Sequence, residues 1–378
     1  MSVYEELGVR RVINARGPAT ISGGSVLDPE VVEAIKSASQ WFVDMNELHR
    51  KAGQRIAELI GVEAAYVTSS CAAALVLATA ACVTGKDPAK IRRLPDTEGM
   101  KNEVIIQKGH LCVYEHCFRA PGTKLIEVGF PNSTEPWEIE EAINEKTAAI
   151  AYVIAPLGPF VGDTQMGMVP LKEVVRIAKK HGIPVIVDAA NMVPPKENLW
   201  KYVHMGADLV AFSGGKLLRG LNSTGLLLGR RDLVEAAAMQ GTPNIGIGRP
   251  MKVSKEQIIA MVKALEIYMR KDESAERKLW EERVQFILNG LRDIPFVKAE
   301  RVFPTLDNRP IPKVHLAIRE KHLGRTAREI VEILKDGDPI IHVQESLLDK
   351  GVLILDPSTL LEGDEKILVE RLKKVLKN

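Results

Sequence analysis

The segment Ile183-Pro-Val-Ile-Val-Asp-Ala-Ala-Asn191 decides the fold. Its apolar part, residues 183–187, is short and rich in β-branched side chains, which is typical of a strand buried on both faces of a parallel sheet. The run ends in Asp188, which places a carboxylate at the carboxyl end of that strand, where open α/β sheets bind ligands. Two interpretations of Asp188 stay open at this point: a ligand contact, or a cap of the next helix.

Short apolar runs and amphipathic helices alternate from about residue 30 to residue 228. Strands are predicted at 64–68, 103–107, 124–128, 148–154, 184–187, 209–212 and 225–228. Helices are predicted at 29–38, 46–59, 136–144, 171–181 and 199–205, and another begins at Ala72. This alternation predicts an α/β fold, with a mainly parallel central sheet and helices on both faces.

The pattern changes after Pro250. Residues 254–291 predict one or two long helices, with Ser254 as the N-cap. Beyond them, strands are predicted at 313–318, 340–343 and 352–355, and helices at 326–334 and 364–376. We therefore expect an N-terminal segment (1–22), a large domain (23–253), and a linker helix followed by a smaller C-terminal α+β domain (254–378).

The composition excludes several classes of protein. The 378 residues include 51 Lys and Arg against 49 Asp and Glu, so a net charge of +2 gives no general attraction to nucleic acid or to an anionic membrane. The longest apolar run, residues 72–83, is too short for a bilayer, which needs about 20 residues. Four cysteines and the absence of a secretory signal pattern lead us to expect a cytoplasmic protein with reduced thiols.

Two further stretches carry chemistry. Ser69-Ser70-Cys71 follows a predicted strand and opens a helix, where free backbone N–H groups suit a phosphate, although a serine here also serves as a plain helix cap. Ser213-Gly-Gly-Lys216 presents a lysine at the edge of the sheet, where lost hydration lowers the pKa of an amine and favours a Schiff base. Taken alone, a Gly-Gly-Lys stretch is most often a solvated loop with an exposed lysine.

Together, the small-residue turn, Asp188 and Lys216 resemble the pyridoxal 5′-phosphate (PLP) enzymes of the fold type I aminotransferase superfamily. The resemblance implies that Lys216 holds PLP as a Schiff base and that Asp188 pairs with the pyridinium nitrogen. The remaining cofactor contacts that it implies are Ser69, Ser70, Cys71, Asn191 and Ser213, with Ser223 and Thr224 reaching the phosphate of a neighbouring subunit. The large domain is then the PLP-binding domain, residues 1–22 lie near the active site, and we expect a homodimer or a higher homo-oligomer.

The stretch from Gln107 to Cys117 crowds His110, Cys112, His116 and Cys117 together. A structural zinc site usually needs a second, distant ligand pair, which has no counterpart here, so we expect no metal. In the superfamily that the chain resembles, this segment supplies the side chain stacked on the pyridine ring. His110 or His116 fits that role, and His110 is preferred because it is nearer to the strand end. It is also expected to assist proton transfer.

Four residues are candidates for binding the substrate. Arg219 shares a helical face with Lys216 if a helix starts there, and it could then receive a carboxylate or phosphate by bidentate hydrogen bonding. A surface arginine is the alternative interpretation. Arg16 and Arg249 have glycine neighbours that let the backbone approach a ligand, and Asn14 lies in the segment that, by the resemblance, lines the mouth of the active site.

Residues 10–20, 118–129 and 212–220 resemble, more narrowly, the branch related to bacterial selenocysteine synthase, over about residues 12–361. That enzyme carries an acidic residue where this chain has Gly215, and it has an extra N-terminal domain for tRNA. The motif around Lys216 in this chain, Ser-Gly-Gly-Lys-x-x-Arg-Gly, is similar instead to that of the D-glucosaminate-6-phosphate ammonia-lyases.

The resemblance predicts a PLP-dependent lyase. It would remove the α-proton and eliminate a β-hydroxyl from a hydroxylated amino acid or amino sugar acid, with or without a phosphate group. Three alternatives stay open. The first is a PLP-dependent racemase, aldolase or aminotransferase. The second is a selenium transferase acting on seryl-tRNA, which is disfavoured, as is any other nucleic-acid partner. The third is a non-catalytic regulatory protein.

Overall fold

The computed structural model describes residues 2–154, 160–161, 164–305 and 309–377, and it contains two compact units. The large unit is Leu27–Lys271, and the small unit combines Met1–Val26, Asp272–Thr305 and Arg309–Asn378. No helix among the described residues is long and apolar enough to cross a membrane.

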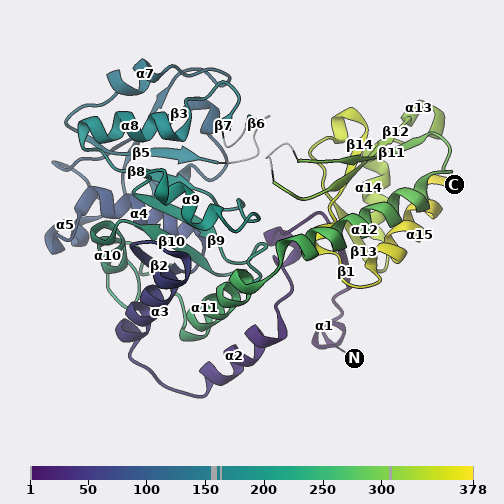
Figure 1. Ribbon diagram of the computed structural model, residues 1–378, viewed down its shortest axis with the longest axis horizontal. Coiled ribbons are helices and arrows are strands. Elements are labelled where there is room, and N and C mark those ends of the chain that lie inside the picture. The colour runs from purple at the N-terminus through teal and green to yellow at the C-terminus, as the bar shows by residue number, and fades with distance from the viewer. Residues whose placement is uncertain (1, 155–159, 162–163, 306–308, 378) are drawn as a thin grey trace. The chain divides into compact units, whose positions relative to one another are not determined.

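The large unit is built on a seven-stranded sheet (Figure 1). In chain order its strands are β2 (Ala64–Thr68), β3 (Glu103–Gln107), β4 (Lys124–Val128), β5 (Thr147–Val153), β8 (Val185–Asp188), β9 (Leu209–Ser213) and β10 (Gly225–Gly229). Their order across the sheet is β2-β10-β9-β8-β5-β3-β4, and a short hairpin, β6 (Phe160–Val161) with β7 (Thr164–Gln165), is separate. Only β10 is antiparallel to its neighbours, β2 and β9. The predicted mainly parallel sheet is confirmed.

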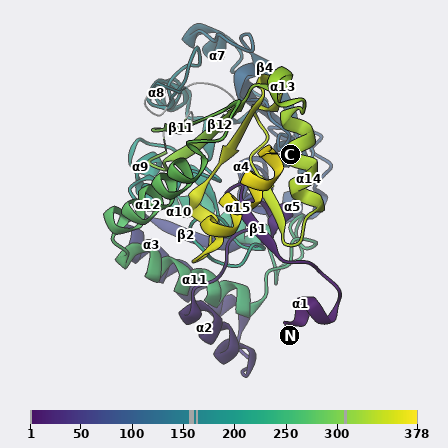
Figure 2. The same ribbon diagram turned by 90° about the vertical axis from the view of Figure 1, so that its right-hand side faces the viewer.

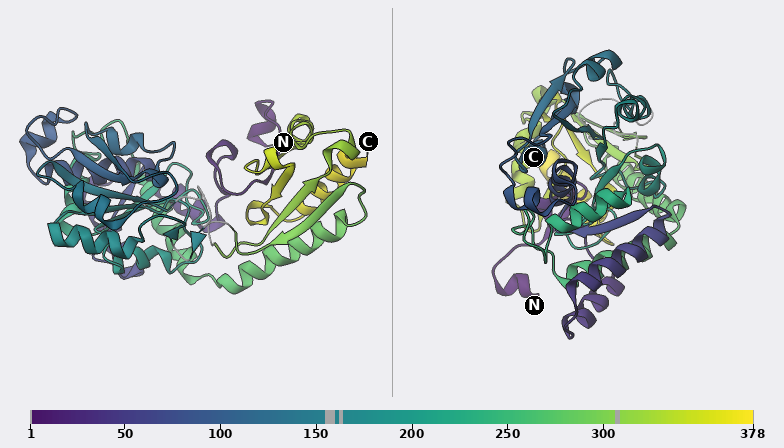
Figure 3. Two further views of the ribbon diagram at one scale, coloured as in Figure 1. Left: turned by 90° about the horizontal axis from the view of Figure 1, so that it is seen from above. Right: turned by 90° about the vertical axis from the view of Figure 1, so that its left-hand side faces the viewer.

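Helices lie on both faces of this sheet (Figure 3). They are α2 (Pro29–Ser39), α3 (Met45–Ile60), α4 (Cys71–Thr84), α5 (Pro88–Arg93), α6 (His116–Arg119), α7 (Pro136–Glu141), α8 (Leu171–His181), α9 (Asn198–His204), α10 (Arg231–Gln240) and α11 (Lys255–Arg270). Strand β5 shows how the faces divide. Its Ile150 and Tyr152 belong to the core that includes α3, α8, α9 and α11, whereas Ala149 and Val153 belong to the core that includes α4, α6 and α10. Because both faces are buried, the strands are continuous apolar runs.

The predicted stretch of one or two long helices is two helices, α11 and α12 (Glu273–Leu291), with the Asp272 side chain capping the second. Helix α11 packs against α2 and α3 and therefore belongs to the large unit (Figure 2). The boundaries expected after residues 22 and 253 thus differ from the edges of the compact units, which lie at residues 26 and 271.

The small unit is an α+β structure with two small sheets. Its remaining elements are α1 (Val3–Glu6), β1 (Val12–Ala15), β11 (Val297–Val302), β12 (Lys313–Ile318), α13 (Glu320–Leu323), α14 (Ala327–Asp336), β13 (Ile340–Val343), β14 (Val352–Leu355) and α15 (Asp364–Lys377). One sheet is antiparallel, in the order β11-β12-β14, and α12 packs against it. In the other, β1 from the N-terminal segment pairs in parallel with β13. The expected C-terminal α+β part is therefore present.

Candidate active site

The carboxyl ends of the parallel strands bring the predicted catalytic residues to one edge of the sheet. Asp188 is the last residue of β8, and its register neighbours are Val153 on β5 and Ala211 on β9. Lys216 follows the end of β9 by three residues. The positive charge of Lys216 acts on both Asp188 and the Cys71 thiol at the start of α4, so the three groups share one electrostatic environment.

Asp188 is a buried carboxylate, with only 6% of its surface exposed. Its Oδ1 accepts hydrogen bonds from the backbone N–H of Ala190 at 2.9 Å and from the Cys71 thiol at 3.6 Å. Burial raises the pKa of Asp188 above its ordinary value, and the Ala190 N–H, the Lys216 charge and the thiol offset only part of that effect. Because an ionised carboxylate in this position is stabilised by a nearby cation, the site fits a protonated ring nitrogen.

The small-residue turn forms the N-terminus of the 14-residue helix α4. Ser70 is the N-cap, and its hydroxyl accepts a hydrogen bond from the Ala73 N–H at 3.0 Å. The Thr68 hydroxyl donates to the Ser70 carbonyl oxygen at 2.8 Å, which fixes the bend between β2 and α4. Ser69 and Ser70 remain half-buried, and backbone N–H groups at a helix N-terminus suit a phosphate. Their roles in binding phosphate stay predictions.

Gly225 supports this turn, and the sequence analysis missed it. It is the first residue of β10 and lies opposite Thr68 in the antiparallel register. A Cβ at this position would lie 2.2 Å from the Ser70 carbonyl carbon and 2.5 Å from the Cys71 nitrogen. The turn therefore packs directly on the backbone of β10. A glycine that opens a strand is the only signal in the sequence, and it gives no partner because the contact spans more than 150 residues.

We expect Gly225→Ala to weaken PLP binding by at least tenfold, because the added methyl group displaces the backbone of the turn. The measurement is a PLP titration of the unliganded protein, followed by fluorescence. Gly61→Ala is the control: its φ of +78° strains an alanine, but the added Cβ meets open space. Equal PLP affinity in wild type and Gly225→Ala would show that the turn does not hold the cofactor.

The two candidate histidines have different environments. His110 is 1% exposed, and its Nδ1 accepts a long 3.5 Å hydrogen bond from the Val153 N–H, on the strand beside Asp188. Its Nε2 is buried without a hydrogen-bond partner among the described residues, and burial lowers the pKa of this ring to about 4. His116 is exposed and pairs through Nδ1 with the Val113 carbonyl oxygen at 2.9 Å. This favours His110 as the residue at the ring, which stays a prediction.

A second buried polar atom without a hydrogen-bond partner among the described residues lies three residues beyond Asp188. This atom is the Oδ1 of Asn191. Buried polar atoms normally find a partner, so the unpartnered amide oxygen beyond β8 and the unpartnered imidazole nitrogen beyond β3 suit a polar ligand at this edge of the sheet. The residues present therefore fit PLP.

The four crowded residues of 107–117 form no metal-ligand group, and the described residues hold no such group elsewhere.

The loop that carries Lys216 is a tight turn rather than the start of a helix. The Arg219 N–H donates to the Lys216 carbonyl oxygen at 2.9 Å, and Arg219 has a φ of +57°, in the left-handed region. Arg219 is half-buried and does not share a helical face with Lys216. The expected substrate role of Arg219 assumed a helix starting at Lys216, and no helix starts there. A substrate contact by Arg219 stays a prediction.

The other residues of this loop hold its shape. The Thr224 hydroxyl is fully buried and donates to the Leu221 carbonyl oxygen at 2.6 Å. Ser223 is exposed, and its hydroxyl accepts from the Gln257 side chain at 2.9 Å. Ser213, at the end of β9, is half-buried. Contacts of Ser223 and Thr224 with a neighbouring subunit stay predictions.

Three more residues are predicted to bind substrate: Asn14 lies in β1 and Arg16 directly follows that strand, whereas Arg249 lies outside the helices and strands of the large unit. In the small unit, Asn14 donates to the Gly17 carbonyl oxygen and accepts from the Arg16 N–H, both at 3.1 Å, so Asn14 shapes the loop that presents Arg16. The Arg16 guanidinium lies 3.9 Å from the Glu345 carboxylate. Arg249 is exposed in the large unit. Their contacts with substrate stay predictions.

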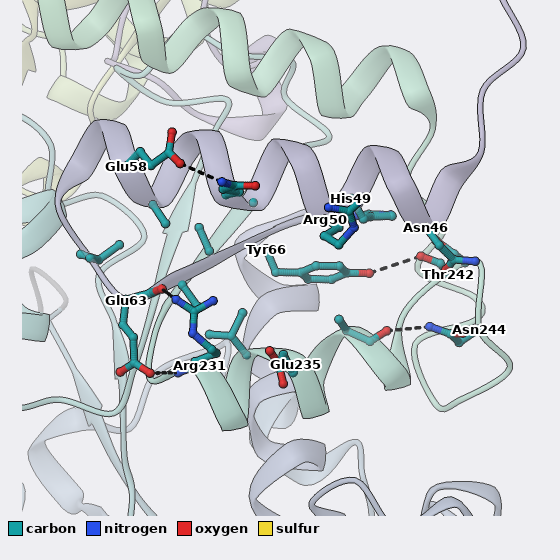
Figure 4. Close-up of a pocket in the computed structure, with 18 of the residues that line it drawn as sticks. Asn46, His49, Arg50, Glu58, Glu63, Tyr66, Arg231, Glu235, Thr242 and Asn244 are labelled. Carbon is teal, nitrogen blue, oxygen red and sulfur yellow. Dashed lines mark hydrogen bonds between the residues drawn. The ribbon is translucent and has the colours of Figure 1, made fainter.

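A separate cavity of about 780 Å³ lies between α3, β2 and α10 in the large unit (Figure 4). Inside it, the His49 ring stacks on Tyr66 with the ring centroids 4.8 Å apart, and the Tyr66 hydroxyl donates to the Thr242 carbonyl oxygen (Figure 4). None of the predicted site residues is among the described residues that line it. The convergence of strand ends, rather than cavity size, therefore locates the candidate active site.

Comparison with known proteins agrees with this geometry. The family model described as SelA, L-seryl-tRNA selenium transferase, matches residues 12–325. The chain belongs to the SelA family. The SelA family consists of fold type I PLP-dependent enzymes, so this chain is an enzyme of the PLP-dependent lyase or transferase type.

Two individual proteins and one solved structure are similar to this chain along nearly its whole length. D-glucosaminate-6-phosphate ammonia lyase of Salmonella typhimurium is 33% identical, over 99% of this chain and 98% of that protein. A 5′-C-glycyluridine monooxygenase-decarboxylase of a Streptomyces species is 35% identical, over 99% and 92% respectively. A solved structure of a D-glucosaminate-6-phosphate ammonia-lyase superposes with a TM-score of 0.87 at 32% identity, covering all of this chain and 98% of that one.

Proposed function

We propose that the protein is a PLP-dependent ammonia-lyase that carries its cofactor on Lys216. The observation that supports the cofactor site best is the buried carboxylate of Asp188 at the strand end, within the field of Lys216 and in contact with the N-terminus of α4. The reaction is supported by the similarity to an ammonia lyase along the whole chain. We infer a hydroxylated amino acid or amino sugar acid as substrate, with or without a phosphate group.

Each polar group of the site has a task in this reaction. When bound, PLP supplies an electron sink for the charge left after removal of an α-proton. Lys216 would hold PLP through its amine, and the same amine, when free, would remove that proton. Asp188 keeps the ring nitrogen protonated. His110 stays a neutral imidazole at pH 7, because burial lowers its pKa to about 4, so it adds no positive charge beside the ring.

The overall reaction balances without an oxidant. Loss of the α-proton and of the β-hydroxyl removes one water from the substrate. Hydrolysis of the resulting enamine returns that water and gives a 2-oxo acid and ammonia. The reaction therefore needs no amino acceptor, unlike that of an aminotransferase, and no dioxygen, unlike that of a monooxygenase-decarboxylase. Its products, ammonia and a 2-oxo acid, separate it from a racemase and an aldolase.

The packing of Gly215 bears on the selenium-transferase alternative. A Cβ at this position would lie 2.3 Å from the Asn222 Cα, which is backbone and cannot be relieved by a side-chain rotation. The acidic residue that selenocysteine synthase carries there would require the Lys216 loop to move. The packing of Gly215 therefore speaks against the selenium-transferase alternative, as the sequence does.

Incubation of the PLP-loaded protein with D-glucosaminate 6-phosphate and with a panel of β-hydroxy amino acids tests the proposal. We expect equal amounts of ammonia and 2-oxo acid from at least one of them, in anaerobic buffer and without an acceptor. Four other results would contradict the lyase. They are product formation only with dioxygen and with release of carbon dioxide, deuterium uptake at Cα without product, retro-aldol cleavage to glycine and an aldehyde, and product formation only with an added 2-oxo acid.

A further inference from the structure

The side chain of Cys71 joins the small-residue turn to Asp188. It is the first residue of α4, directly after the cap Ser70, and only 8% of its surface is exposed. Its Sγ lies 3.6 Å from Asp188 Oδ1. The family resemblance implies that Cys71 contacts the phosphate of the cofactor, whereas the Cys71 thiol contacts the Asp188 carboxylate.

We propose that Cys71 is a positioning residue that orients the Asp188 carboxylate toward the ring nitrogen of PLP, an inference that rests on the proposed function. Both hydrogen bonds that the Asp188 carboxylate accepts among the described residues converge on Oδ1, one from the Ala190 N–H and one from the Cys71 thiol. Two donors on one oxygen fix the rotation of the carboxylate. Oδ2 is thereby left for the pyridinium proton.

The thiol acts as a donor because it stays protonated. Burial raises the pKa of Cys71 well above its ordinary value, and the Asp188 carboxylate raises it further, against a smaller opposing effect of Lys216. A neutral thiol donates to the carboxylate, whereas a thiolate would repel it. A thiol is also a weak donor, so it orients the carboxylate without taking much of the basicity that the ring nitrogen needs.

The position of Cys71 couples the two ends of the cofactor site. Its backbone belongs to the turn that packs on Gly225, while its side chain contacts Asp188 on β8. Neighbouring thiols do not share this contact. Cys117 on α6 is 2% exposed and lies in the electrostatic field of Asp188, but no hydrogen bond between the two is present among the described residues. The chain therefore offers a buried thiol as a matched control.

The test is the protonation of the ring nitrogen, measured by ¹⁵N NMR on protein loaded with PLP labelled at that nitrogen. We expect wild type and Cys117→Ala to hold a protonated nitrogen across the neutral range. In Cys71→Ala, the pH at which the ring nitrogen loses its proton falls, and PLP affinity drops three- to tenfold. Cys71→Ser retains a hydroxyl donor and restores most of the protonation, which a merely space-filling role would not do.

The outcomes separate this inference from the proposed function. A protonated ring nitrogen in wild type with an identical pH profile in Cys71→Ala would overturn the role of Cys71 alone. Equal losses in the serine and alanine variants would overturn it too, by assigning the effect to volume. If wild type holds no PLP at Lys216, the proposed function fails first. Should Cys71→Ala not fold, Cys71→Val takes its place, because valine fills a similar volume without a donor. A pH profile of Cys71→Val identical to that of wild type would then overturn the role of Cys71.

Discussion

Lys216→Ala is expected to lower turnover by at least about 10³-fold, because the substitution removes both the covalent anchor of PLP and the base that takes the α-proton. The measurement is single-turnover kinetics with the best substrate of the panel, with and without a small primary amine such as methylamine. We expect the added amine to restore part of the rate, since it supplies a mobile base of the same kind.

Lys101→Ala serves as the control for this substitution. Lys101 is exposed and precedes β3, at the opposite end of the strand from the site, so its loss leaves turnover unchanged. A Lys216→Ala variant that retains more than a tenth of the wild-type rate without added amine would remove Lys216 from the reaction.

Asp188→Asn is expected to lower turnover by about 10²–10³-fold, the range typical of losing one preorganised electrostatic group. The amide can still accept the Ala190 N–H, so the backbone contact survives, but the negative charge opposite the ring nitrogen is gone. The measurement is kcat and KM for the same substrate. A loss confined to KM would place Asp188 in substrate binding instead of at the cofactor.

Although Asp188→Asn is expected to lower turnover, it should leave the stability of the unliganded protein unchanged or raise it. Burial raises the folded-state pKa of Asp188 above its unfolded value, so the folded protein binds this proton more tightly than the unfolded chain does. The unliganded wild type therefore loses stability as pH rises through the window between the unfolded and the folded pKa of Asp188. We expect unliganded Asp188→Asn to melt at or above the wild-type Tm at pH 7, and PLP to raise Tm less in the variant. A lower Tm for the unliganded variant would contradict this account.

Much of the large unit follows from the sequence, because strands buried on both faces are unbroken apolar runs. Strands β2, β3 and β4 coincide with the predicted ranges, and the carboxylate of Asp188 closes β8 as expected. In the small unit, β11 was not predicted. Its side chains alternate between half-buried and exposed along most of its length, so it lacks the apolar signal of a core strand.

The site was predictable where one residue type carries the chemistry and unpredictable where packing decides. Asp188 and Lys216 stand out by type and spacing. By contrast, the left-handed backbone of Arg219 comes from the turn closed on Lys216, and the importance of Gly225 comes from an antiparallel neighbour. The link between Cys71 and Asp188 joins residues 117 positions apart, which no local pattern encodes.

Reduction of the PLP-loaded protein with borohydride, followed by peptide mass spectrometry, tests the central claim most directly. Borohydride converts a Schiff base into a stable amine and leaves the phosphopyridoxyl group on the lysine that held it. The account predicts this modification on the peptide that contains Lys216, in an amount equal to the PLP bound. Modification of another lysine, or PLP that washes away unreduced, would contradict it.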